Sequence, residues 1–476
     1  MVPTPPLAGG VRVGYTLRGE SCLRAEEGAT ISDHRDASGA VTRRQLIKGA
    51  ATTGAAMALS LDAAATQTPD ARALKVGAAK RVITPDPLLP VSGGMGPANP
   101  AREKRGDLTA RALYMSKGGE AVGIVSLDLL GFPSVLGDRV RARIGKLRPD
   151  QILIGATHAH SGPDCYAFPD GKGGHTGDLA YMERVCGLAA EALNAAIEGA
   201  RPATLRIGTG EAQGKIAYNY YAPDLYDRRM SVIQATGSDG KRIATLVNYA
   251  IHPEVLGNEV GILSPDLCGP MYDHIEEKGG GMGMFMNGAQ GGMVTADNRI
   301  LDRPKDAQRG YWEDARTWDE CLRIGGLMAD EALRIVSDAP YQADPELACL
   351  SATATLPVDS DDLWMVVTHS PLRYPHGKDR TIKARLNLVN IGDAQILTVP
   401  GEALPNIGFY LKRRMRGKHN LVFGLTNEAF GYILTKEDFR SYPRYDYVSR
   451  VSLGERTADI LMDKWLGLVA AAPAPR

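Results

Sequence analysis

Short runs with strand character alternate with amphipathic helical runs from residue 74 to residue 469. The apolar run QILIGAT, at residues 151–157, is typical of a buried strand. The run at residues 178–200 places an apolar stripe on one face of a helix, made of Leu179, Met182, Val185, Ala189, Leu193 and Ile197. No internal repeat or long Pro/Ser linker divides this alternation. The pattern therefore predicts one large α/β domain at residues 71–476, with a mixed β-sheet core and flanking helices.

The same patterns predict the main elements of that domain. Two strands joined by a turn at residues 238–240 are expected within residues 229–253. Helices are expected at residues 134–147, 266–277, 315–336, 403–415 and 451–469. Residues 298–311 are polar and are expected to form a long loop.

Residues 1–70 form an N-terminal extension with the layout of an export signal. Arg43 and Arg44 precede a mildly apolar run at residues 49–61 and an Ala-rich stretch at residues 63–65. The paired arginines resemble a twin-arginine signal, which predicts a periplasmic or extracellular protein. The alternative is a disordered tail. The apolar run is too short and too rich in Ala, Gly and Thr for a stable membrane span, so no transmembrane anchor is expected after signal removal.

The charge balance argues against a nucleic-acid partner. The chain has 55 Lys and Arg residues, 55 Asp and Glu residues, and no concentrated basic run. Proteins that bind nucleic acid through phosphate contacts carry a basic surplus or patch. A small-molecule or lipid substrate is therefore the expected partner, and the sequence does not predict an oligomeric state.

Polar residues follow several of the strand-like runs, where α/β proteins build their sites. They are His158, His160, His252, Asn287, Gln290, Glu402 and residues 427–432. In an extended segment His158 and His160 point to the same side. With a third histidine and a carboxylate they form a plausible set for Zn²⁺, which lowers the pKa of a bound water to about 7. The spacing alone leaves open an ordinary structural role for each histidine.

Several segments resemble the neutral ceramidase family in the same order along residues 74–450. THAHSGPD resembles the family's THTHSGP segment, and LTVPGEAL resembles its PGEF segment. The others are the opening strands VGAAKRVITP, LTARALYM and AVGIVSLDLLG, the second histidine segment GKRIATLVNYAIHPEVLG, and the tyrosine segment NEAFGYILTKEDF with YPRYDY. Each match is modest, but the ordered set is specific.

The resemblance implies roles for particular residues. The implied zinc ligands are His158, His252, Glu402 and Tyr432. His160 would lie beside the metal and bind polar atoms of the substrate, and Tyr445 would hold the carbonyl oxygen.

Three departures from the family pattern concern the substrate side of the site. The family's serine in GDVSPN falls on Val294 here, and Thr295 could replace it only if the loop shifts by one residue. The family's arginine after an asparagine is Tyr220. We also expect no C-terminal immunoglobulin-like domain.

Together these features imply an exported, zinc-dependent hydrolase that cleaves the amide bond of an N-acyl, ceramide-like substrate with zinc-activated water. The alternatives are a zinc hydrolase for another amide or ester, and a non-catalytic relative that binds lipid or zinc. A nucleophilic hydrolase that uses Thr295 or Ser161 is a further alternative, although the segment around Ser161 lacks the G-x-S-x-G elbow.

Overall fold

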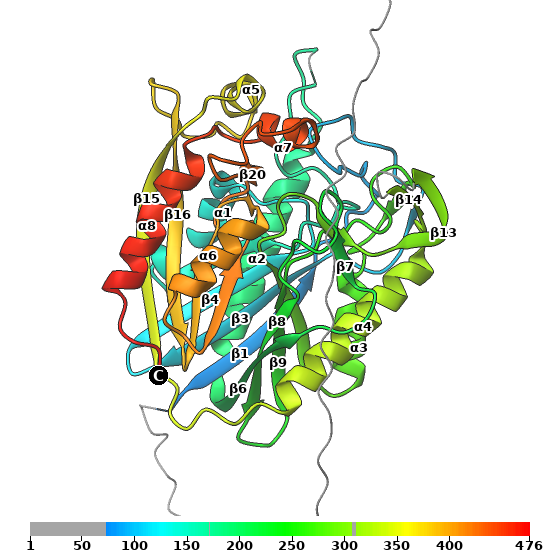
Figure 1. Ribbon diagram of the computed structural model, residues 1–476. Helices are drawn as coiled ribbons and strands as arrows, with labels where there is room; N and C mark the ends of the chain where they lie inside the picture. Colours follow the sequence, from blue (N-terminus) through cyan, green and yellow to red (C-terminus); the bar gives the residue numbers. More distant parts are fainter. Residues whose placement is uncertain (1–72, 171, 307–310) are drawn as a thin grey trace, which may run out of the picture. The chain divides into compact units, whose positions relative to one another are not determined.

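The computed structural model describes residues 73–170, 172–306 and 311–476 (Figure 1). The proposed export signal lies outside these residues. Within the described residues, none of the helices has the length and apolar character needed to cross a bilayer.

An eight-stranded sheet has the order β11-β9-β8-β6-β1-β3-β4-β5. Its strands are β1 (Lys75–Val82), β3 (Thr109–Lys117), β4 (Glu120–Leu127), β5 (Ile152–Ala156), β6 (Arg201–Glu211), β8 (Arg229–Gly237), β9 (Arg242–Tyr249) and β11 (Met282–Asn287). The edge strands β5 and β11 pair in parallel with β4 and β9, and the other neighbours pair antiparallel. The predicted mixed sheet is thus confirmed.

A second, four-stranded sheet has the order β15-β16-β17-β19. Its strands are β15 (Leu347–Pro357), β16 (Thr381–Ile391), β17 (Ala394–Thr398) and β19 (His419–Phe423). Inward side chains of both sheets, such as Leu113, Leu246, Ile396 and Phe423, form one shared core. Since side chains alternate along a strand, each sheet turns its other face toward helices.

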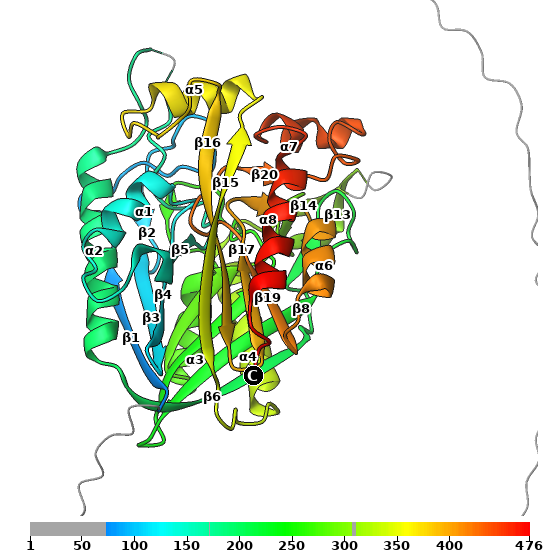
Figure 2. The ribbon, with the colours of Figure 1, turned by 90° about the vertical axis from the view of Figure 1, so that its left-hand side faces the viewer.

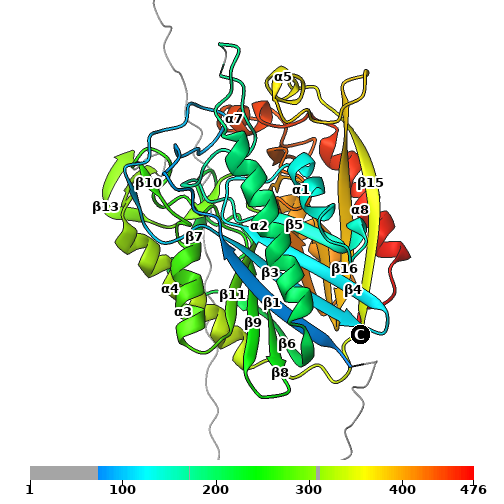
Figure 3. The ribbon, with the colours of Figure 1, turned by 180° about the vertical axis from the view of Figure 1, so that it is seen from behind.

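Helices cover the outer faces of the two sheets. Figure 3 shows α2 (Leu179–Glu198), α3 (Cys268–Glu277) and α4 (Trp318–Ser337) over the larger sheet. Figure 2 shows α6 (Pro405–Arg414) and α8 (Thr457–Ala471) beside the smaller one. Trp465 of α8 is wholly buried, and its indole N–H donates to the Thr398 carbonyl at 3.0 Å. The described chain therefore forms a helix–sheet–sheet–helix arrangement.

The remaining regular elements are short or lie at the ends of the sheets. The helices are α1 (Ser134–Arg141), α5 (Asp361–His369), α7 (Asp446–Arg450) and the 3-10 turns η1 (Pro149–Gln151) and η2 (Pro443–Tyr445). The strands are β2 (Glu103–Lys104), β7 (Ala217–Asn219), β10 (Ile262–Leu263), β12 (Val294–Ala296), β13 (Arg299–Asp306), β14 (Tyr311–Asp314), β18 (Glu402–Ala403) and β20 (Tyr432–Ile433).

The expected long loop at residues 298–311 is wrong for residues 299–306, because they form β13, which pairs antiparallel with β14. Most side chains of β13 are exposed or half-buried. The strand therefore has no buried face, and its sequence lacks the apolar alternation from which strands are recognised.

Candidate metal centre

His158 lies just beyond the end of β5, in a strained backbone conformation. Its φ of 71° is in the left-handed region, which residues other than Gly rarely adopt. The segment is therefore not extended as expected, although His158 and His160 still face the same space. The ring Nδ1 of His158 donates to the Leu130 carbonyl at 2.6 Å. This bond places the ring proton on Nδ1 and leaves Nε2 free to bind a metal.

His252 lies beyond the end of β9 and is held in the same way. Its Nδ1 donates to the Val294 carbonyl at 2.8 Å, and its side chain is wholly buried. The His252 Nε2 therefore points toward Glu402, 3.0 Å from its Oε2, and is the second imidazole nitrogen that could bind a metal.

Glu402 lies on β18, which pairs in parallel with β20, so that Glu402 is the partner of Tyr432. The Glu402 Oε2 lies 3.3 Å from the His158 Nε2 and 3.0 Å from the His252 Nε2. Burial opposes ionisation of Glu402, but both histidines favour it and hold its pKa well below the ordinary value. The same pairing raises the pKa of His252, against the effect of burial.

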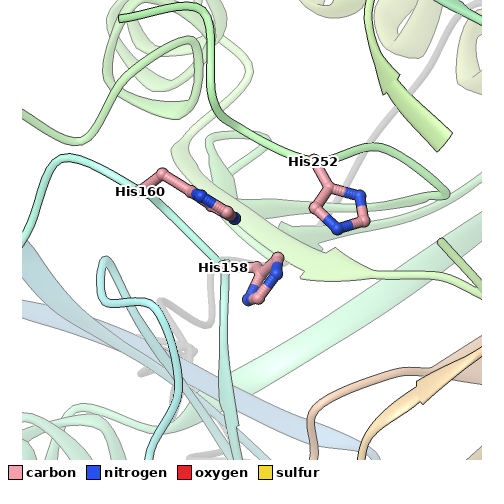
Figure 4. Close-up of side chains that lie close together, drawn as sticks. All are labelled: His158, His160 and His252. Carbon is pink, nitrogen blue, oxygen red and sulfur yellow. The ribbon is translucent and has the colours of Figure 1, made fainter. Parts of the chain in front are cut away.

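Figure 4 shows His158, His160 and His252 around one point, from two segments that are far apart in sequence. Their ring centroids are 4.7 Å apart for His158 with His160 and with His252, and 5.7 Å for the third pair. The three rings form a group that could hold a metal ion. Two oriented imidazole nitrogens and a carboxylate oxygen are the donors that zinc commonly takes, so the residues fit the predicted metal.

Tyr432 lines the same cavity as His158, His160 and Glu402. Its hydroxyl is 3.2 Å from the Met293 sulfur. Burial and the Glu402 carboxylate raise the pKa of Tyr432 well above its usual value, so the phenol stays protonated at neutral pH.

The structure brings Tyr447, rather than Tyr445, into the wall of this cavity. Tyr447 lies 5.9 Å from Tyr432 between ring centroids. Tyr445 instead packs against Tyr442 and Tyr221, at 4.4 and 5.6 Å. The two tyrosines are two residues apart at the junction of η2 and α7, so the sequence could not decide which of them reaches the site.

The residues that depart from the family pattern take separate positions. Val294 is wholly buried in the core, and only its carbonyl serves the site, as the partner of His252. The hydroxyl of Thr295 helps to lower the pKa of the Glu254 carboxyl group. Tyr220 is 37% exposed and stacks on Tyr311 with ring centroids 5.0 Å apart.

Glu254 is a residue of the site that the sequence analysis missed. It follows His252 by two residues, and its Oε2 lies 3.7 Å from the His160 Nδ1. Burial opposes its ionisation, but His160, His252 and Thr295 lower the pKa of Glu254 overall. Its place in the segment His-Pro-Glu, beside a candidate ligand, was the available signal.

Apolar side chains form much of the remaining cavity wall beside the histidines. They come from an N-terminal loop, from the segment after His160, from α5 and from the loop before β20: Met95, Phe168, Leu363, Val366, Val367 and Phe430. A largely apolar cavity with a few polar groups suits a ligand of the same character.

Glu428 is a second buried carboxyl group in the cavity wall, and it has no candidate ligand role. Its Oε1 accepts hydrogen bonds from the backbone N–H groups of Ser134 and Ala429, at 3.0 and 3.2 Å. Burial outweighs these bonds and raises the pKa of Glu428 to about 7, from an ordinary value of 4.5. The folded protein therefore keeps a proton there that the unfolded chain loses at lower pH.

We expect Glu428→Gln to change how stability depends on pH. In wild type this group stabilises the fold fully below pH 4.5, and its contribution is lost as pH rises through about 7. The glutamine does not ionise, so the variant should gain about 3 kcal/mol relative to wild type between pH 4.5 and pH 8. Urea unfolding across that range measures the difference. The exposed Glu120→Gln is the control, and a parallel pH dependence in Glu428→Gln and wild type would contradict the expectation.

Comparison with known proteins identifies the fold. No protein-family model and no curated protein sequence matches this chain. The crystal structure of neutral ceramidase from Pseudomonas aeruginosa is similar, with a TM-score of 0.68 and 17% identity over 85% of this chain and 76% of that chain. A ceramidase structure described as complexed with C2 has a TM-score of 0.67 and 16% identity, over 85% of this chain and 77% of that one. The chain therefore has the fold of neutral ceramidase, as the ordered motifs predict.

Proposed function

We propose that this protein is a zinc-dependent hydrolase of the neutral ceramidase family that cleaves the amide bond of an N-acyl, ceramide-like substrate. The observation that carries the proposal is that His158 Nε2 and His252 Nε2 lie 3.3 and 3.0 Å from Glu402 Oε2, and that His158 and Glu402 line a largely apolar cavity. The proposed zinc ligands are these three residues and Tyr432. Similarity to two ceramidase structures supports the same chemistry.

A zinc ion bound there would lower the pKa of a coordinated water to about 7 and polarise the substrate carbonyl. The protein groups prepare the site for this chemistry. The Leu130 and Val294 carbonyls fix the proton of each ligand histidine on Nδ1, so that both Nε2 atoms remain acceptors. Glu402 is held ionised and supplies the negative charge of the ligand set.

Other side chains of the cavity would bind the substrate. The hydroxyl of Tyr447, which lines the cavity and whose pKa is raised by burial, would donate a hydrogen bond to the carbonyl oxygen, the role that the resemblance gave to Tyr445. An oxyanion donor of this kind strengthens its bond as charge develops in the transition state. Val366 and Val367 of α5, with Phe168 and Phe430, offer an apolar surface for an acyl chain.

Metal removal and restoration test the proposal. We expect the purified protein to contain about one zinc per chain and to release amine from a fluorescent N-acyl-sphingosine. Dialysis against a chelator should abolish turnover, and stoichiometric zinc should restore it. Magnesium at the same concentration is the control, because its preference for oxygen ligands does not suit two imidazoles.

The remaining outcomes separate the alternatives. Zinc without turnover of this substrate would favour another amide or ester, or a non-catalytic binding protein. Turnover that survives complete removal of zinc would contradict the metal mechanism and favour a nucleophilic hydrolase.

Export is a separate proposal, which N-terminal sequencing of protein from the periplasm and the medium would test.

A further inference from the structure

The segment that follows His252 approaches His160 at two points. Its backbone N–H donates to the Pro253 carbonyl at 3.0 Å, and its ring Nδ1 faces the Glu254 Oε2 at 3.7 Å. The second distance is longer than a hydrogen bond, but contacts of this kind often shorten when a ligand binds. The Glu254 side chain is 19% exposed, and its carboxylate is the negatively charged group nearest to Nδ1 of His160 that the segment after His252 supplies.

The other nitrogen of the His160 ring has no hydrogen-bond partner. Nε2 is buried, and His160 lies in the cavity wall beside His158, Glu402 and Tyr432. A carboxylate can only accept a hydrogen bond, so Glu254 favours the tautomer that has its proton on Nδ1. Nε2 then presents a lone pair to the cavity. A buried acceptor of this kind is completed by a donor on the ligand.

We infer that Glu254 is a positioning residue that makes His160 Nε2 a hydrogen-bond acceptor for the substrate, and that the site therefore selects secondary amides, whose N–H meets this acceptor. The inference rests on the proposed function, since it concerns the amine side of the same scissile bond. This inference makes the role of His160 more specific. An unprotonated Nε2 cannot donate a hydrogen bond to the carbonyl oxygen, so Tyr447 and the metal would stabilise that oxygen. An ester of the same acyl chain has no N–H to offer.

Nitrogen NMR tests the tautomer without any turnover. The probe is protein with ¹⁵N-labelled histidine, loaded with ¹¹³Cd in place of zinc, and the His160→Ala variant identifies the His160 signals. We expect His160 to carry its proton on Nδ1, with an unprotonated Nε2 and no coupling to cadmium, while His158 and His252 couple. A proton on Nε2, or coupling of His160 to cadmium, would overturn the inference even if the enzyme proves active.

Substrate discrimination tests the consequence. Glu254→Gln keeps the size of the side chain but adds an N–H₂ group that can donate to Nδ1, which favours the other tautomer. We expect kcat/KM for the secondary amide to fall about 10- to 100-fold, which corresponds to the loss of one hydrogen bond to a charged or buried group. The zinc content should not change. The matched ester should change less than about threefold.

The control variant is Glu259→Gln, an exposed glutamate in the same segment, which should leave both substrates unaffected. Equal losses for amide and ester in Glu254→Gln would indicate a merely structural role and overturn the inference. If wild type turns over neither substrate, the proposed function fails, while the NMR result still decides the tautomer.

Discussion

Replacement of Glu402 by glutamine is expected to empty the metal centre and to lower kcat/KM for an N-acyl amide by about 10³-fold. Glu402 Oε2 faces both ligand nitrogens, at 3.3 and 3.0 Å, and is the proposed anionic ligand. Glutamine keeps the shape but removes the charge. Loss of the metal would remove several kcal/mol of transition-state stabilisation. Because each tenfold change in rate corresponds to about 1.4 kcal/mol, this loss accounts for the expected decrease in kcat/KM.

Two measurements check this expectation, and only one of them depends on activity. Zinc per chain is determined after dialysis against a fixed free zinc concentration, and the shift in Tm on adding zinc reports binding to the folded state. Wild type and the surface variant Glu120→Gln should both bind zinc and gain stability from it. Glu402→Gln should do neither. Full zinc content and wild-type turnover in Glu402→Gln would show that the carboxylate is not a ligand.

The sequence predicts which residues follow the strands at this site better than it predicts how their side chains are oriented. Apolar runs such as QILIGAT place His158 and His252 beyond buried strands, and the structure has both residues there. The orientation of each ring depends on distant carbonyls, at Leu130 and Val294, which no local pattern reveals. The φ of 71° at His158 is likewise a product of tertiary contacts.

The site residues that the sequence analysis missed lie in a loop or in short helices. Glu254 lies in a loop, where the side-chain direction does not follow a period of 2.0 or 3.6. The choice between Tyr445 and Tyr447 depends on how α7 begins after η2, a detail of one or two residues. Helix α5 was not predicted, although it supplies Val366 and Val367 to the cavity wall. Its nine residues bury few side chains, so its apolar pattern is short.

Asn287 joins the two histidine segments to the sheet. It is wholly buried at the end of β11, and its Nδ2 donates to the carbonyls of Thr157 and Ile251, at 3.0 and 2.7 Å. Its Oδ1 accepts from the backbone N–H groups of Ile251 and Gly288, at 3.2 and 2.8 Å. Thr157 and Ile251 immediately precede His158 and His252. One amide group therefore fixes the two proposed ligand histidines relative to each other.

Asn287→Ala should accordingly weaken both the fold and the metal centre. Loss of these bonds leaves buried backbone groups unpaired, which we expect to cost about 3–5 kcal/mol in the free energy of unfolding of the metal-free protein. Zinc affinity should fall about 10- to 100-fold, the usual effect of removing a group that orients metal ligands. Urea unfolding in chelator and competition for zinc with a metal indicator measure the two effects.

One further variant separates the hydrogen bonds of Asn287 from its volume, and a second, at another asparagine, serves as the control. Asn287→Asp keeps the size but cannot donate to Thr157 and Ile251, so it should lose zinc affinity as Asn287→Ala does. Asn194→Ala removes a single bond, to the Arg143 carbonyl at 3.2 Å near the surface, and should cost no more than about 1 kcal/mol. If Asn287→Asp binds zinc as wild type does, the donated bonds do not orient the histidines. Zinc affinity is measured at a temperature where both Asn287 variants remain folded. A lower zinc affinity in both of them would therefore show that the geometry at the strand ends, and not stability alone, sets the affinity of the metal centre.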